Sequence, residues 1–179
     1  IHIPRRSALG LLSGAAAMAM RGGTAVAAEE ARAWASFKAR FLSPEGRVID
    51  NNNNNQSHSE GQGWGLSLAE HFDDRPAFDS MLLWTRRNLR RESDLLHSWR
   101  WLPDRQPPVQ DSNNATDGDL FIASALLKGG RRWSDPALTE EGTAIARDVL
   151  RLLVRRAGGY LVLLPGARGF EHRDHVVLN

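Results

Sequence analysis

Hydrophobic residues recur at intervals of three and four along most of the chain, which is the period of an amphipathic helix. Trp34, Phe37 and Phe41 show this spacing near one end. Runs rich in proline, glycine and asparagine separate the periodic segments. The predicted helices cover residues 29–41, 59–72, 76–90, 116–127 and 135–156. Few segments show the alternation of a strand, so the sequence predicts an all-α domain.

Polar residues and glycines mark the expected ends of these helices. Ser57 or Ser59 is expected to cap the second helix, and Asn114 or Thr116 the fourth. At such positions a side-chain oxygen accepts a hydrogen bond from a free backbone N–H group. The two glycines at residues 129–130 are expected to end the fourth helix, because glycine commonly follows the last helical turn.

The first 28 residues have the features of an export signal. Arg5 and Arg6 precede an apolar run, and residues 25–27 are the small residues that a signal peptidase requires. The apolar run is too short for a membrane-spanning anchor. We therefore predict a signal peptide at residues 1–28 and a mature domain at residues 29–179, located in the periplasm or secreted. The arginine pair leaves twin-arginine and general secretion both open.

The charge balance argues against a nucleic-acid partner. The chain has 23 Lys and Arg residues against 21 Asp and Glu residues. Cleavage of the signal would remove Arg5, Arg6 and Arg21 and no acid, so the mature domain is close to neutral and the basic footprint of a nucleic-acid-binding protein is missing. No cysteine is present, which excludes disulfides and thiolate metal ligands. His172 and His175 would share a helix face only if this end were helical, and a solvated loop is the preferred interpretation.

The segment from Ser57 to Gly65 places one carboxylate among small residues beside an indole. Glu60 and Trp64 are four residues apart, so they share a face if the segment is helical. A glycosidase needs a carboxylic acid to protonate the leaving oxygen, and aromatic faces bind sugar rings. An isolated glutamate here would more often be a first-turn residue, but its neighbours favour catalysis. The surrounding glycines are expected to let a polymer approach the backbone.

A helix start is an unusual place for a general acid. The positive end of a helix stabilises a carboxylate, whereas a general acid must keep its proton near neutral pH. We therefore expect that burial against Trp64, or a nearby carboxylate, raises the pKa of Glu60.

A second pair of acids, Asp117 and Asp119, lies at the predicted start of the fourth helix. Both could be helix caps or first-turn acids, and that interpretation is preferred for Asp119. The residues around Asp117 are small, as they are around Glu60.

Residues 95–102 are predicted to be extended, followed by a proline-rich loop at residues 103–111. Trp99 and Trp101 then point to opposite faces. One is expected to line a cleft and the other to join the core. Arg100 between them suits hydrogen bonding to sugar hydroxyls, with a plain surface role equally open.

These segments together resemble glycoside hydrolase family 8. The resemblance rests on the string from Ser57 to Gly65 and on the string from Ala115 to Asp119, in this order, supported by residues 47–50, 99–101 and 164–166. It covers about residues 40 to 179 and is strongest to the endo-β-1,4-glucanases that accompany bacterial cellulose synthase. It implies an (α/α)6 barrel, a toroid of paired helices, of which this chain would be about the first half.

The resemblance also implies a reaction. An inverting enzyme cleaves β-1,4-glucosidic bonds in cellulose with one acid and one base that activates water. Glu60 matches the general acid, and Asp117 matches the aspartate that binds and distorts the sugar ring. The base is expected beyond Asn179, and no metal or organic cofactor is required. The expected glucan-binding residues are Trp64, Trp99, Arg100 and Trp101.

Several expectations depend on this resemblance. A related chitosanase, xylanase or lichenase would keep the same acid, and a non-catalytic glucan-binding remnant is the alternative if the chain is naturally complete. The cellulose synthase machinery is an implied partner, and no membrane association is expected after signal cleavage. Ile1 in place of methionine suggests a fragment. Residues 29–179 alone are expected to be inactive and poorly folded, because some apolar faces would lack their full set of partners, such as those of Trp84, Leu120, Ile122 and Leu126.

Overall fold

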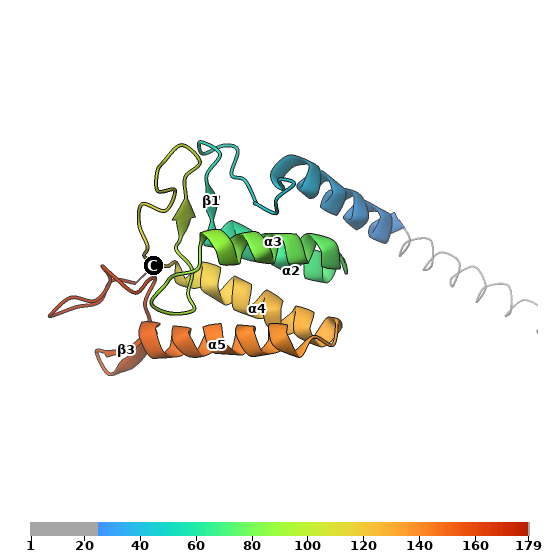
Figure 1. The fold of residues 1–179 in the computed structure, drawn as a ribbon. Coiled ribbons are helices and arrows are strands. Elements are labelled where there is room, and N and C mark those ends of the chain that lie inside the picture. Colours follow the sequence, from blue (N-terminus) through green and yellow to red (C-terminus); the bar gives the residue numbers. More distant parts are fainter. Residues whose placement is uncertain (1–24, 179) are drawn as a thin grey trace, which may run out of the picture. The chain divides into compact units, whose positions relative to one another are not determined.

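The computed structural model describes residues 25–178 and is mainly helical (Figure 1). The chain divides into a unit up to Arg40 and a unit from Phe41 onward. A helix at residues 25–41 forms the described part of the first unit, and in it the rings of Trp34 and Phe37 stack with their centres 5.5 Å apart. Most of the predicted signal peptide lies outside the described residues, and its last four residues begin this helix.

The second unit contains four helices and two small sheets among the residues described. In chain order these are β1 (Ser57–His58), α2 (Ser59–His71), α3 (Arg75–Asn88), β2 (Arg100–Trp101), α4 (Thr116–Arg132), α5 (Pro136–Leu153), β3 (Val154–Ala157) and β4 (Tyr160–Leu163). The strands pair as two antiparallel ribbons, β1 with β2 and β3 with β4. Helix α2 packs against α3 and α4, and α4 packs in turn against α5, so α4 lies between α2 and α5 (Figure 1). None of the helices described is long and apolar enough to cross a membrane.

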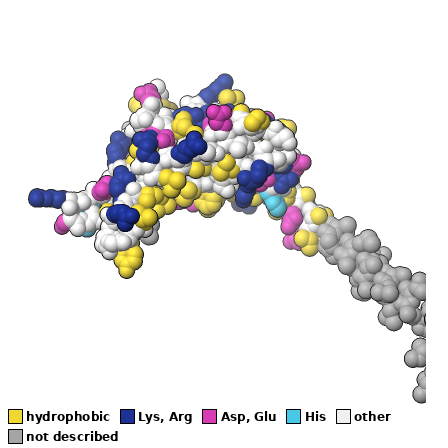
Figure 2. Space-filling model, turned by 90° about the horizontal axis from the view of Figure 1, so that it is seen from below, with side chains coloured by type: hydrophobic (Ala, Val, Ile, Leu, Met, Phe, Trp, Pro, Cys, Tyr) yellow, Lys and Arg dark blue, Asp and Glu magenta, His cyan; other side chains and the backbone are white. Residues whose placement is uncertain are grey.

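The core of the second unit lies between these four helices. Trp84, Ile122 and Leu126 are buried in it, so the expectation that they lack partners is wrong. Leu120 is 42% exposed, as expected. Figure 2 shows hydrophobic side chains gathered in a band on one face. The most exposed large apolar residues of this unit are Trp64, Leu150, Tyr160 and Leu161.

Helix caps divide into those that follow the sequence rule and those that do not. Asp74 and Asp135 cap α3 and α5 through their carboxylates. In contrast, α2 and α4 have no side-chain cap, so the caps predicted for them are wrong. The hydroxyl of Ser57 donates to the carbonyl of Val48 at 2.6 Å, and that of Thr116 donates to a distant carbonyl at residue 164. These hydroxyl groups bond to backbone carbonyls distant in the sequence and do not cap the helices.

Two predicted helix ends are also wrong. Helix α4 continues through its two glycines to Arg132. Packing against α5 uses the bare backbone there, since a β-carbon at Gly130 would lie 2.2 Å from the hydroxyl oxygen of Thr139. Helix α5 ends at Leu153 rather than near residue 156. Residues 158–159 adopt positive φ angles of 56° and 85°, which glycine tolerates, and they turn the chain into the β3–β4 hairpin.

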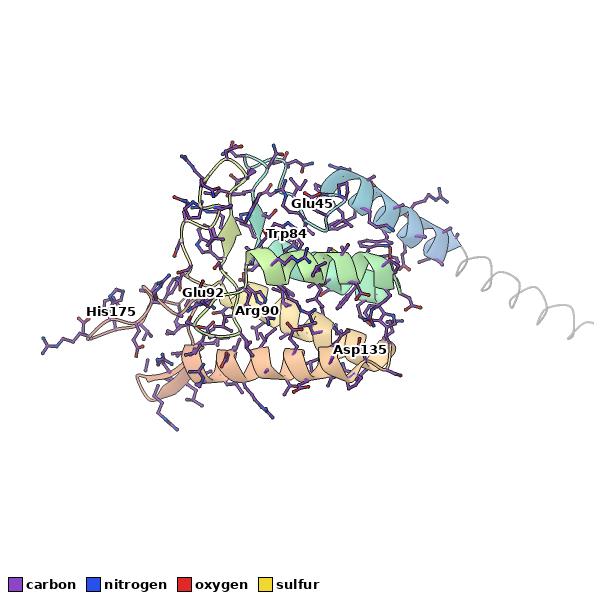
Figure 3. All side chains as sticks on the ribbon, in the orientation of Figure 1. Glu45, Trp84, Arg90, Glu92, Asp135 and His175 are labelled. Carbon is purple, nitrogen blue, oxygen red and sulfur yellow. The ribbon has the colours of Figure 1, made fainter. Side chains whose placement is uncertain are left out.

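Ion pairs hold α3 against α5. Arg86 and Arg90 both bind Glu141 on α5, and Arg75 binds Asp135 at 2.8 Å. Arg75 begins α3 and Arg86 lies in its last turn, so both ends of α3 are joined to the N-terminal half of α5, the end at which Figure 3 labels Asp135. Burial alone would raise the pKa of Glu141, but the two guanidinium groups outweigh it and the pKa is lowered.

Candidate active site

Glu60 lies in the first turn of α2 and is half-buried. The pairing of β1 with β2 brings the tryptophan triplet to this turn, since Ser57 faces Trp101 in the ribbon. The backbone N–H of Ser59 also donates to the carbonyl of Trp99 at 3.1 Å. Trp64 follows one turn later on the same face of the helix and is 52% exposed. The predicted acid and indole therefore share an accessible helix face.

The glycines of these segments allow α2 and α4 to approach closely. A β-carbon at Gly118 would lie 2.3 Å from the hydroxyl oxygen of Ser59, and one at Gly63 would lie 2.6 Å from the β-carbon of Phe121. Contacts this short leave no room for a methyl group. The expectation that the glycines beside Glu60 admit a polymer is therefore wrong for Gly63. Gly63 and Gly118 instead admit the neighbouring helix and bring Glu60 beside Asp117.

The closeness of Asp117 affects the pKa of Glu60. Burial raises its pKa, and the negative charge of Asp117 raises it further. Both effects disfavour the carboxylate, so they oppose the helix dipole and keep a proton on Glu60 to higher pH. Asp117 is thus the nearby carboxylate that we expected to raise the pKa of Glu60. Trp64 contacts Phe121 edge-on at 6.1 Å between ring centres and remains largely open to solvent.

Asp117 lines an open groove of about 870 Å³. Trp99, Asp111 and Asn113 line it, together with the start of α4. Apolar residues 161–165 from β4 and the following turn form much of the remaining lining. Glu60 adjoins this groove through its neighbour Asp117. A hollow lined by carboxylates, apolar side chains and an indole suits an extended polar ligand with apolar faces, as a sugar chain has.

Trp99 and Trp101 have different surroundings, as the alternation predicted. Trp99 lines the groove, and the guanidinium of Arg100 lies 4.3 Å from the centre of its ring. Trp101 packs edge-on against Trp84 and lies beneath the guanidinium of Arg47. The structure therefore brings Trp99 to the groove and leaves Trp101 outside its lining.

Comparison with known proteins agrees with this geometry. The family model described as Glycosyl hydrolases family 8 matches residues 7–179. The chain belongs to glycosyl hydrolase family 8. A probable endoglucanase from Novacetimonas hansenii is 47% identical over 97% of this chain and 51% of its own length. An endoglucanase from Cellulomonas uda is 40% identical over 82% of this chain and 41% of its own length.

Solved structures show the same relationship. The endo-β-1,4-glucanase CMCax from Acetobacter xylinum matches with a TM-score of 0.81 and 50% identity, over 84% of this chain and 47% of that one. Family 8 structures are (α/α)6 barrels, so the predicted fold class is confirmed. The chain spans about half the length of the relatives that it matches.

Two polar residues that line the groove of this family 8 chain were not predicted from the sequence. Asp111 and Asn113 come from the loop before α4, where no periodic pattern indicates which side chains converge. A tight turn holds them, because the carboxylate of Asp111 accepts a hydrogen bond from the backbone N–H of Asn113 at 2.9 Å. An aspartate two residues before an asparagine is a weak turn signal that could have identified the turn but not the groove.

Asp119 does not cap α4, which corrects its predicted role. It is fully buried, and its carboxylate accepts hydrogen bonds from the backbone N–H and Nδ1 of His97 at 2.9 and 3.0 Å. Asn114 donates to its other oxygen at 2.9 Å. Since His97 precedes Trp99 by two residues and Asp119 follows Asp117 by two, this buried link connects the two segments that line the groove.

Replacing Asp119 by Asn should destabilise the fold. In this variant an NH₂ group replaces one carboxylate oxygen, and it would face a hydrogen-bond donor. The amide of Asn114 cannot turn to present its oxygen to that NH₂ group, because it would then lose the hydrogen bond that this oxygen accepts from the N–H of Ala167. We expect a loss of about 1–3 kcal/mol in the free energy of unfolding, measured by denaturant titration of the full-length protein. Asp104→Asn, in an exposed loop, is the matched control. Equal stability of the two variants would contradict this role.

The described residues contain no group of three histidine or acidic side chains that could hold a metal ion. His58 stacks parallel to Trp99 with ring centres 6.2 Å apart. Burial lowers its pKa, and Arg100 lowers it further, against the raising effect of Asp50. His172 and His175 stack on each other in a terminal loop.

Proposed function

We propose that the protein carrying this chain is an endo-β-1,4-glucanase that hydrolyses cellulose by an inverting mechanism. One observation carries the proposal: in a member of family 8, Glu60 lies beside Asp117, which lines a groove together with Trp99, and the pKa of Glu60 is raised. The relatives named as endoglucanases support the choice of substrate.

In this mechanism Glu60 donates its proton to the glycosidic oxygen as the bond to the anomeric carbon breaks. Asp117 binds the sugar ring beside that bond and keeps Glu60 protonated. A second carboxylate must remove a proton from water on the opposite face of the ring. Nothing in the surroundings of Asp117 assigns it that role, and we place the base in a part of the protein outside this sequence. Trp99 provides a stacking surface, and protonation, water attack and ring distortion require no cofactor.

We further propose that the protein is exported to the periplasm or secreted and acts in bacterial cellulose synthesis, beside the synthase machinery. The arginine pair and apolar run of residues 1–28 support export. The match to a probable endoglucanase from Novacetimonas hansenii supports the biological setting. Amino-terminal sequencing of the protein recovered from the periplasm would test cleavage after residue 27 or 28, and recovery of an uncleaved cytoplasmic form would contradict it.

The activity is tested on the full-length protein with four polymers: carboxymethylcellulose, xylan, chitosan and mixed-linkage glucan. We expect the largest release of reducing ends from carboxymethylcellulose, with a rapid fall in viscosity because cleavage is internal. Proton NMR of fresh products should show the α-anomer first, since inversion converts a β-linkage to an α-product. Preferred cleavage of another polymer would move the protein to a related specificity, and binding without hydrolysis would favour a glucan-binding remnant.

A further inference from the structure

Asp111 holds the indole of Trp99 by its edge. The indole Nε1–H donates to one carboxylate oxygen of Asp111 at 3.0 Å. The other oxygen accepts the backbone N–H of Asn113 at 2.9 Å. The backbone of Trp99 is tied to the same turn, since its N–H donates to the carbonyl of Asn113 at 2.9 Å. One short turn thus fixes both the main chain and the ring of Trp99.

The other contacts of Asp111 do not account for its position beside the indole of Trp99. Its ion pair with Arg168 is 3.3 Å long, with both side chains more than half exposed, and exposed pairs of this kind add little stability. The N–H of Asn113 lowers the pKa of Asp111, and Trp99, Arg168 and Arg100 lower it further against the raising effect of burial. The carboxylate is therefore ionised at neutral pH, which strengthens the hydrogen bond that it accepts from the indole.

The orientation of this indole matters because Trp99 and Asp111 both line the groove that Asp117 also lines. A sugar stacks on an aromatic ring only when the two planes are nearly parallel, so a ring held in one orientation binds with a smaller loss of conformational entropy. Arg100 lies over the ring, and His58 stacks parallel to it with ring centres 6.2 Å apart, but neither contact is a hydrogen bond. The hydrogen bond from the indole Nε1–H to Asp111 fixes the edge of the ring, and it therefore limits rotation about the Cβ–Cγ bond, the rotation that tilts the ring plane.

We propose that Asp111 is a positioning residue that holds Trp99 in the orientation that binds the glucan chain. This inference rests on the proposed function for its ligand, a β-1,4-linked glucose oligomer. Asp111 acts through the indole and does not itself recognise the sugar. Its loss should weaken substrate binding and leave the bond-breaking step nearly unchanged, because Glu60 and Asp117 lie on α2 and α4 and not on the turn that contains Asp111.

A double-mutant cycle in the full-length protein tests this. Asp111→Ala and Trp99→Phe should each raise the Kd for cellohexaose, measured by calorimetry, by about tenfold, the size of one favourable contact. KM for carboxymethylcellulose should rise by a similar factor with kcat changed less than twofold. Phenylalanine has no N–H group, so adding Asp111→Ala to Trp99→Phe should cause no further loss. Asp104→Ala, an exposed loop acid, should bind like the parent.

A second measurement does not depend on any sugar. The chain has six tryptophans, and the indole N–H signal missing from the ¹H–¹⁵N spectrum of Trp99→Phe identifies Trp99. In Asp111→Ala this signal should move upfield and exchange faster with solvent. An unmoved signal overturns the inference, as does a further loss of binding in the double variant, which would mean that Asp111 contacts the sugar itself. A shifted signal in a protein that binds no cellohexaose would uphold the contact and refute the proposed substrate.

Discussion

Glu60→Gln should reduce the turnover of carboxymethylcellulose by about a thousandfold, within the range that general-acid catalysis contributes. Glutamine retains the size and polarity of the side chain but has no acidic proton for the leaving oxygen. The interaction that is lost belongs to the transition state, so kcat should fall while the Kd for cellohexaose changes little. The measurement is reducing-sugar release by the full-length protein, with calorimetry for binding.

The matched control is Glu140→Gln, which makes the same substitution at an exposed position of α5. This variant should keep parental turnover and binding. If Glu60→Gln hydrolyses the polymer at a rate near that of Glu140→Gln, Glu60 is not the proton donor.

Asp117→Asn should also lower turnover strongly, because it removes a carboxylate from the groove beside the expected cleavage point. It should in addition change the pH profile. Glu60 must be protonated to act, and its raised pKa places the alkaline limb of kcat/KM at higher pH. Removing the charge of Asp117 removes one of the two causes of that shift, so the alkaline limb should move to lower pH. Burial remains, and the pKa should stay above that of a free glutamate.

Comparison with Asp119→Asn separates the two roles. Asp117 is exposed in the groove and Asp119 is fully buried, so the first variant should be stable with strongly reduced turnover and the second mainly unstable. A stable, inactive Asp119→Asn together with a near-normal Asp117→Asn would show that the two assignments are reversed.

The sequence predicted the helices well because helical spacing is a local signal. It also placed Glu60 and Trp64 on one helix face, since residues four apart always share one. The helix starts were harder, because Ser57 and Thr116 each had a choice between a nearby N–H group and a distant carbonyl. Folding settled that choice through contacts 9 and 48 residues away, which no local rule contains.

Local sequence patterns were also insufficient to predict which side chains line the groove. Asp117 was found through its small neighbours and the family resemblance, whereas Asp111 had no comparable context within its loop. Its importance appears only when its carboxylate meets the indole of Trp99, 12 residues away. The buried role of Asp119 was missed for the same reason, because His97 lies 22 residues away and an acid in a first turn ordinarily suggests a cap.

The missing side chain at Gly118 bears on how the working pH of this protein can change. A β-carbon there would meet Ser59 Oγ at 2.3 Å and the backbone nitrogen of Glu60 at 2.8 Å, so any larger residue would force the starts of α2 and α4 apart. Repulsion between the carboxylates weakens as their separation grows, and Glu60 would then release its proton at lower pH. A change at a residue that never ionises would therefore lower the upper pH limit of activity.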